Sequence, residues 1–141
     1  MSMLLDIDLE PGVLHVVATG EFSLEEGKRT FLQMLAAVAV HKSNKVLFDG
    51  SKLTGNPETL ERFYYGEFAA QSVVEFEGRG VSCDTQFAYI LTEPLLDPKR
   101  FGETVAVNRG MKVKAFDNAA EALQWLVSVY LLAINCFSQV G

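Results

Sequence analysis

The chain has 141 residues, of which 49% are hydrophobic and 21% are charged. This composition favours one folded domain with a substantial core and excludes an intrinsically disordered chain. Eighteen acidic residues against twelve basic ones give a net charge of −6, and the basic residues are scattered, which argues against a nucleic-acid partner.

Targeting and redox features are those of a cytoplasmic protein. The N-terminal stretch MSMLLDIDLEPG is too short and too acidic for a signal peptide, and no apolar run reaches the roughly 18 residues that a membrane span needs. Cys83 and Cys136 have neither a metal-ligand spacing nor a disulfide pattern. We therefore expect two reduced thiols, no metal and no other cofactor.

The N-terminal part of the sequence predicts a β-hairpin followed by a helix. Apolar and acidic residues alternate over 3–10, Pro11-Gly12 marks a turn, and β-branched residues return over 13–19. Ser23 and Glu26 have the spacing of a capping box, and apolar residues at helical spacing follow as far as His41. We expect a helix over 23–41.

Strands and helices alternate in the rest of the chain. A short apolar strand over 45–48 is typical of a buried parallel strand, and Asn56-Pro57 predicts an N-cap and helix start. Strands are expected over 85–91 and 111–116, with a helix over 98–109 behind Asp97. Asn118 and Glu121 form a second capping pair before the last helix. The inward stripe expected for the helix after Pro57 is Leu60, Phe63, Tyr64 and Phe68.

This order predicts an α/β fold in a single domain over 1–141. Its sheet is mixed, mostly parallel and five-stranded, with an N-terminal antiparallel hairpin and flanking helices. An apolar helical extension over about 127–141 carries apolar residues on two faces. We expect it to form a homodimer; a membrane surface ranks second, since no Lys or Arg follows Lys114.

The stretch from Asp49 to Asn56 is the candidate site. A polar loop between a buried strand and a helix start is where open α/β folds bind ligands, and the free amides of a helix start favour a small anion. The alternative is that these side chains satisfy local backbone groups only. Tyr65, off the helix stripe, and Glu93, after the next strand, complete the set. The candidate ligand- or partner-binding residues are Asp49, Gly50, Ser51, Thr54, Gly55, Asn56, Tyr65 and Glu93.

No catalytic signature is present. The sequence has no Gly-x-Ser-x-Gly elbow, no glycine-rich phosphate fingerprint and no His–Glu metal motif, so we expect no catalytic residues and no enzyme. Cys83 is expected to be inert rather than nucleophilic. The aromatic residues over 63–76 leave a third possibility, an apolar-ligand (lipid-like) or membrane-surface protein, if a cavity lies between that helix and the sheet.

Three stretches resemble the SpoIIAA-like family of the STAS superfamily, relatives of bacterial anti-sigma factor antagonists. They are VLFDG at 46–50, TGNPETLERF at 54–63 and RFGETVAVNRGMKVKAFDNAAEALQWL at 100–126. The resemblance covers about 5–127 and implies a mixed sheet flanked by helices, with a non-enzymatic signalling role in regulation or ligand binding.

The resemblance also bears on phosphorylation and partner binding. Antagonists of this superfamily carry a phosphorylatable serine in a pattern like Asp-x-Ser-x-x-Asp-Ser-Ser-Gly. Asp49 and Ser51 match its beginning, but the Asp-Ser-Ser-Gly core is absent and Thr54 is the nearest hydroxyl. The possible phosphoacceptors are therefore Thr54 and Ser51, and the resemblance implies a protein partner at this loop.

Overall fold

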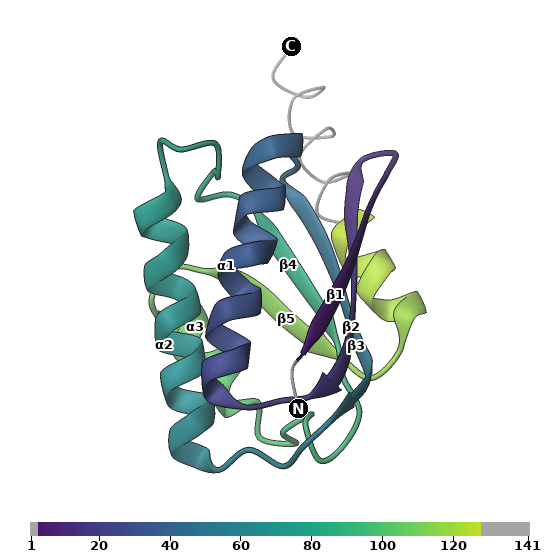
Figure 1. Ribbon diagram of the computed structural model, residues 1–141, viewed down its shortest axis with the longest axis vertical. Coiled ribbons are helices and arrows are strands. Elements are labelled where there is room, and N and C mark those ends of the chain that lie inside the picture. The colour runs from purple at the N-terminus through teal and green to yellow at the C-terminus, as the bar shows by residue number, and fades with distance from the viewer. Residues whose placement is uncertain (1–2, 128–141) are drawn as a thin grey trace, which may run out of the picture.

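A five-stranded sheet of order β1-β2-β3-β4-β5 organises the computed structural model, which describes residues 3–127 (Figure 1). β1 (Leu4–Glu10) and β2 (Val13–Glu21) are antiparallel, whereas β3 (Lys45–Thr54), β4 (Gln86–Ile90) and β5 (Lys112–Phe116) continue the sheet in parallel. The predicted sheet is confirmed. The extension beyond residue 127, and the homodimer contact assigned to it, lie outside the described residues.

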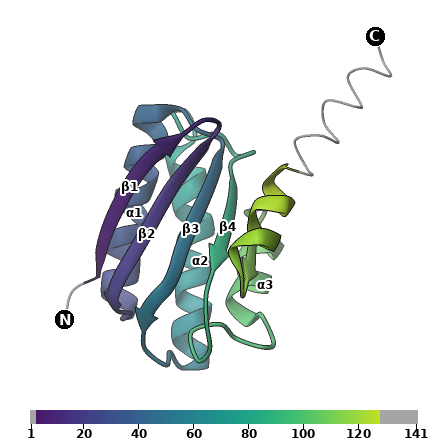
Figure 2. The same cartoon turned by 90° about the vertical axis from the view of Figure 1, so that its right-hand side faces the viewer.

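Helices cover the sheet on both faces (Figure 2). α1 (Leu24–His41), α2 (Thr59–Phe76) and α3 (Phe101–Asn108) pack on one face, and the helical segment 119–127 packs on the other. Adjacent residues of β3 divide between the two layers, because side chains alternate along a strand. Phe48 belongs to the core under α1–α3, and Leu47 contributes to the core under 119–127.

The start of α1 confirms one half of its predicted capping box. The Glu26 amide donates to the Ser23 hydroxyl at 3.2 Å. The other half is wrong: the Glu26 carboxylate accepts from the Met3 amide at 3.0 Å and from Arg29 instead of returning to Ser23. The Glu26 side chain thereby ties the start of β1 to α1.

The strand predicted over 45–48 is longer than expected, and the predicted loop from Asp49 to Asn56 is wrong as far as Thr54. β3 continues to Thr54 because β2 also continues, pairing Thr19 with Lys52 and Glu21 with Thr54 after a register shift. Leu53 is buried in this extension while Lys52 and Thr54 are exposed. Ser51, Lys52 and Thr54, which suggested a loop, are solvent-exposed residues of a strand.

The start and the inward face of α2 also differ from the prediction. α2 begins at Thr59, and Glu58, whose amide donates to the Glu61 carboxylate at 2.9 Å, occupies the N-cap position expected for Asn56. Leu60 is 64% exposed and Tyr64 is 46% exposed, whereas Phe68 packs against the core, so the expected apolar stripe is confirmed only in part. The buried residues of α2 are Gly66, Ala69, Ala70, Ser72 and Val73.

The last two helix starts fit the prediction in part. α3 begins at Phe101 rather than Pro98, because the Asp97 carboxylate accepts from the Phe101 amide at 2.8 Å across an intervening turn. The Glu121 amide donates to the Asn118 side chain at 2.9 Å, which confirms Asn118 as the cap of the segment 119–127.

The face of α2 that carries small residues packs closely against α3. A Cβ atom placed on Gly66 would lie 2.5 Å from the Gly102 carbonyl oxygen of α3, and one on Gly102 would lie 3.1 Å from the Arg62 carbonyl oxygen of α2. The two backbones therefore meet directly, and glycine is needed at position 66 to let them.

Gly66→Ala should destabilise the fold. A backbone oxygen cannot move aside as a flexible side chain can, so overpacking costs about 1–3 kcal/mol, against a gain of about 1 kcal/mol in helix propensity. An approach of 2.5 Å to a backbone oxygen places the overpacking cost in the upper part of this range, about 2–3 kcal/mol, so we expect the free energy of unfolding in urea to fall by about 1–2 kcal/mol. Gln71→Ala, at an exposed position of α2, is the control and should change it by less than about 0.5 kcal/mol. An unchanged or increased stability of Gly66→Ala would contradict the contact.

Candidate functional site

Hydrogen bonds within the 49–54 stretch are mostly local. The Asp49 carboxylate accepts from the Ser51 amide at 3.0 Å and from the Ser51 hydroxyl at 2.7 Å. The Thr54 hydroxyl donates to the Gly20 carbonyl at 3.3 Å. These are the bonds expected of turn and strand-edge side chains, although Ser51, Thr54 and Asn56 remain exposed to solvent.

The α2 N-terminus does not have the charge that an anion site needs. Glu58 and Glu61 occupy its cap and first turn, and the Glu61 carboxylate already accepts from the Glu58 amide. A carboxylate at this end of a helix compensates the helix dipole and repels a second anion. The geometry therefore favours a local structural role for this helix start.

The two glycines of the candidate set pack closely against their neighbours. A Cβ on Gly50 would lie 2.7 Å from Leu91 Cδ2, and Gly55, with φ of +128°, lies against Phe22. Both positions require glycine for packing or backbone conformation, which is sufficient reason for their presence.

The structure does not bring the eight candidate residues together. Tyr65 alone of them lines the pocket found beneath α2 and α3 in the described part of the chain. Glu93 is exposed in the segment that follows β4. Asp49, Ser51, Thr54 and Asn56 lie outside the pocket wall.

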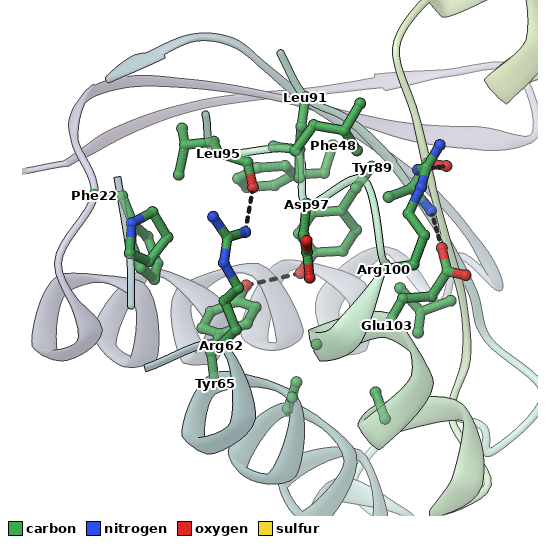
Figure 3. A pocket seen from close by; sticks show the side chains of 18 of the residues that line it. Phe22, Phe48, Arg62, Tyr65, Tyr89, Leu91, Leu95, Asp97, Arg100 and Glu103 are labelled. Carbon is green, nitrogen blue, oxygen red and sulfur yellow. Dashed lines mark hydrogen bonds between the residues drawn. The ribbon is translucent and has the colours of Figure 1, made fainter. Parts of the chain in front are cut away.

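This pocket, here called the α2–α3 pocket, has a volume of about 130 Å³ and lies between the two helices and the sheet (Figure 3). Its wall is predominantly apolar, and small residues on the helices face large ones on the strands. The small helix residues of the wall are Gly66, Ala69, Gly102 and Ala106, and the large apolar residues of the sheet and loops include Phe22, Phe48, Leu53, Tyr89, Leu91, Leu95 and Leu96.

Two tyrosines form a polar pair in this wall. The hydroxyls of Tyr65, from α2, and Tyr89, from β4, are 2.8 Å apart (Figure 3). Tyr65 packs edge-on against Phe22, and Tyr89 lies 4.6 Å from Phe48 between ring centroids. Burial raises the pKa of Tyr65 to about 12, against an opposing effect of the hydrogen bond, and burial also raises the pKa of Tyr89 well above its usual range. Both phenols are therefore neutral near pH 7.

Arg62, on α2, holds the segment after β4 in place beside the pocket through hydrogen bonds. Its guanidinium donates to the Leu95 carbonyl at 2.7 Å (Figure 3). It also donates to the Pro94 carbonyl at 2.7 Å, so α2 holds this segment through two backbone contacts. Asp97 on the same segment has a lowered pKa, because the Phe101 and Lys99 amides donate to it and Arg62 is nearby; burial acts in the opposite direction.

Two charged residues that line the pocket at the start of α3, Arg100 before the helix and Glu103 within it, hold the edge strand. Arg100 donates to the Ala115 carbonyl, and the Glu103 carboxylate accepts from the Ala115 amide at 2.6 Å. β5 is an edge strand, so these side chains take the place of a missing neighbouring strand. The charged groups at the pocket are thus committed to backbone partners.

Sequence reasoning did not find most of this pocket. Tyr65 is among the candidate residues predicted from the sequence, whereas Tyr89 and Arg62 are not. A usable signal was present in the small residues Gly66, Ala69 and Ala70 at helical spacing, which mark where a helix approaches its neighbours closely.

Metal and membrane features can be stated for residues 3–127. No group of three or more His, Cys, Asp or Glu side chains there is placed to hold a metal ion. None of the helices in that range combines the length and apolar character needed to cross a bilayer.

The buried tyrosine pair predicts a loss of stability at high pH. Tyr65 has a folded-state pKa of about 12, above its ordinary value of 10.0, so the unfolded chain loses this proton first. Its contribution is complete below pH 10 and is lost as pH rises toward 12, by about 1.4 kcal/mol per pH unit at most. Urea unfolding at intervals from pH 9 should show this decline in the wild type and a smaller one in Tyr65→Phe/Tyr89→Phe. Tyr64→Phe, at an exposed position of α2, should behave as wild type; identical slopes in all three proteins would contradict the buried pair.

Comparison with known proteins identifies the fold. No protein-family model and no curated protein matches the chain. Two solved structures that resemble it are an anti-sigma factor antagonist from Mycobacterium paratuberculosis, with 14% identity and a TM-score of 0.59, and an uncharacterized DUF3478-family protein with a SpoIIAA-like fold from Shewanella loihica PV-4, with 18% identity and a TM-score of 0.49. Each match covers 89% of this chain and 94% of the other. The first of these matches confirms the resemblance at the level of architecture: the chain has the α/β fold of an anti-sigma factor antagonist.

Proposed function

We propose that this protein is a non-enzymatic regulatory module that binds a small apolar molecule in the α2–α3 pocket. The observation that carries the proposal is a pocket of about 130 Å³ with a mainly apolar wall, in a fold shared with an anti-sigma factor antagonist. Concave, mostly apolar sites with few polar groups are the usual form of small-molecule sites.

The size of the pocket favours a compact molecule. An apolar protein cavity of about 150 Å³ stays dry and binds benzene, so a volume of about 130 Å³ suits one ring or a short branched chain. A long acyl chain exceeds this volume, so most of it would lie outside the pocket. Among apolar ligands, the pocket therefore favours ring-sized molecules over long-chain lipids.

An occupant could influence the exposed surface through Leu53. This side chain lies in the pocket wall, while its neighbours Lys52 and Thr54 are exposed on the β3 extension. A ligand shifts a conformational equilibrium only by binding one state more tightly, and contact with Leu53 gives it the means to do so. The proposed output is a change in how the 49–56 surface meets a partner.

A protein partner at the 49–56 surface is the second candidate. It is favoured by the exposure of Ser51, Thr54 and Asn56 next to the pocket wall. The acidic start of α2 makes a free anionic ligand there less favourable than a protein surface. A phosphoryl group found on Ser51 or Thr54 in protein from its natural source would support this candidate.

Filling the pocket should abolish binding of an apolar probe. Benzene at about ten times its Kd should raise the wild-type melting temperature by about 3–6 °C, because it binds the folded state alone. Ala69→Leu places a larger side chain in the pocket wall and should remove this increase without lowering the melting temperature of the free protein.

Ala36→Leu is the matched control, because Ala36 is exposed on α1, outside the pocket wall. It should retain the full benzene effect. An absent effect in the wild type, or an equal one in Ala69→Leu, would overturn the proposed site.

A further inference from the structure

We infer that the Tyr65–Tyr89 pair is the polar end of the α2–α3 pocket and donates one hydrogen bond to a ring-sized molecule that carries a neutral acceptor, such as a ketone or ester carbonyl. This inference rests on the proposed function. It adds the chemical class of the ligand and the residues that select it.

Counting hydrogens shows that the pair has a donor to spare. Two phenols supply two O–H groups, and the 2.8 Å contact between them uses one. Within residues 3–127, neither hydroxyl has another hydrogen-bond partner. The rings that pack around Tyr65 and Tyr89 are those of Phe22, Phe31 and Phe48, which offer no oxygen or nitrogen acceptor.

The remaining donor is in a costly position unless something accepts from it. Tyr89 is only 7% exposed, and both tyrosines line the pocket. A buried donor without a partner has lost its hydration and gained nothing in return, so an acceptor delivered by the occupant recovers part of that free energy. The hydroxyl that accepts the hydrogen bond between the two phenols is polarised by it, and its own O–H group thereby becomes a better donor.

The charges around the pocket favour a neutral acceptor over a carboxylate. Arg62 and Arg100 donate to backbone carbonyls, and Glu103 accepts from a backbone amide. An anion placed against the apolar wall would lose its hydration and gain one phenolic donor in return, which does not compensate a buried charge. A carbonyl has a far smaller desolvation cost, and one donor satisfies it.

Two ring-sized probes separate apolar binding from this hydrogen bond. Cyclohexanone carries a carbonyl acceptor, and methylcyclohexane is close to it in size but has none. The Kd of each probe is measured by NMR titration of the wild type and of Tyr65→Phe/Tyr89→Phe. Comparing the change in Kd between the two proteins for one probe with the change for the other cancels the difference in hydrophobicity between the probes.

The double variant should weaken cyclohexanone binding about two- to tenfold, the effect of one net hydrogen bond, and change methylcyclohexane binding by less than about twofold. It should fold normally, because removing both members of a buried pair leaves no unpaired polar atom. Each single Phe variant retains one O–H group and should keep most of the affinity for cyclohexanone. A merely structural role for the pair would not give this pattern.

The carbonyl stretch of bound cyclohexanone supplies a readout that needs no variant. Infrared spectra of the wild-type complex should show this band at lower frequency than in an alkane solvent, as a hydrogen-bonded carbonyl does. The band of the complex with the double variant should return to the alkane position.

The failures of the two proposals are distinguishable. If neither probe binds the wild type, the proposed function is wrong and this inference falls with it. If both probes bind but the double variant affects them equally, or the carbonyl band is unshifted, the pocket binds apolar molecules without the tyrosine donor and the inference alone is overturned. A water molecule satisfying the pair would give this second result.

Discussion

The direct contact between the backbones of α2 and α3 sets the geometry on which the rest of the site depends. Gly66 and Gly102 let the helices meet with no side chain between them. The neighbouring positions, Ala69 and Ala106, are also small, so the helices cannot fill the space above the aromatic residues of β3 and β4. A close contact in one place thus leaves an unfilled volume beside it.

The polar groups around this volume are arranged so that the pocket stays apolar. Arg62 holds the segment after β4, and Arg100 with Glu103 completes the hydrogen bonding of the edge strand. These charges have backbone partners, and the tyrosine pair in the pocket wall is the polar feature that we infer meets an occupant. Apolar walls with one donor give affinity through burial and orientation through a single bond.

The architecture could be predicted because its signals are local. Alternation over 3–10, the Pro11-Gly12 turn and the Ser23 cap each predict an element without reference to distant residues, and element order then predicts the parallel sheet. The same logic failed at β3, where Ser51 and Thr54 are strand residues on the solvent side, paired through an extension of β2 that the sequence does not signal.

The inward face of α2 could not be predicted from hydrophobicity. Leu60 and Tyr64 are large and apolar but exposed, whereas Gly66 and Ala69 are small and buried, because the space available is set by α3. The pocket forms where side chains from distant parts of the chain, such as Tyr65 and Tyr89, leave space between them unfilled. The spacing of residues along a single helix or strand therefore cannot indicate it.

Native mass spectrometry of the protein isolated from its natural source tests the central claim most directly. The account predicts a non-covalent adduct with the mass of a ring-sized molecule bearing a carbonyl or similar neutral acceptor, present on the wild type and absent from Ala69→Leu. A chain that carries no such adduct, or one that Ala69→Leu retains in full, would contradict it.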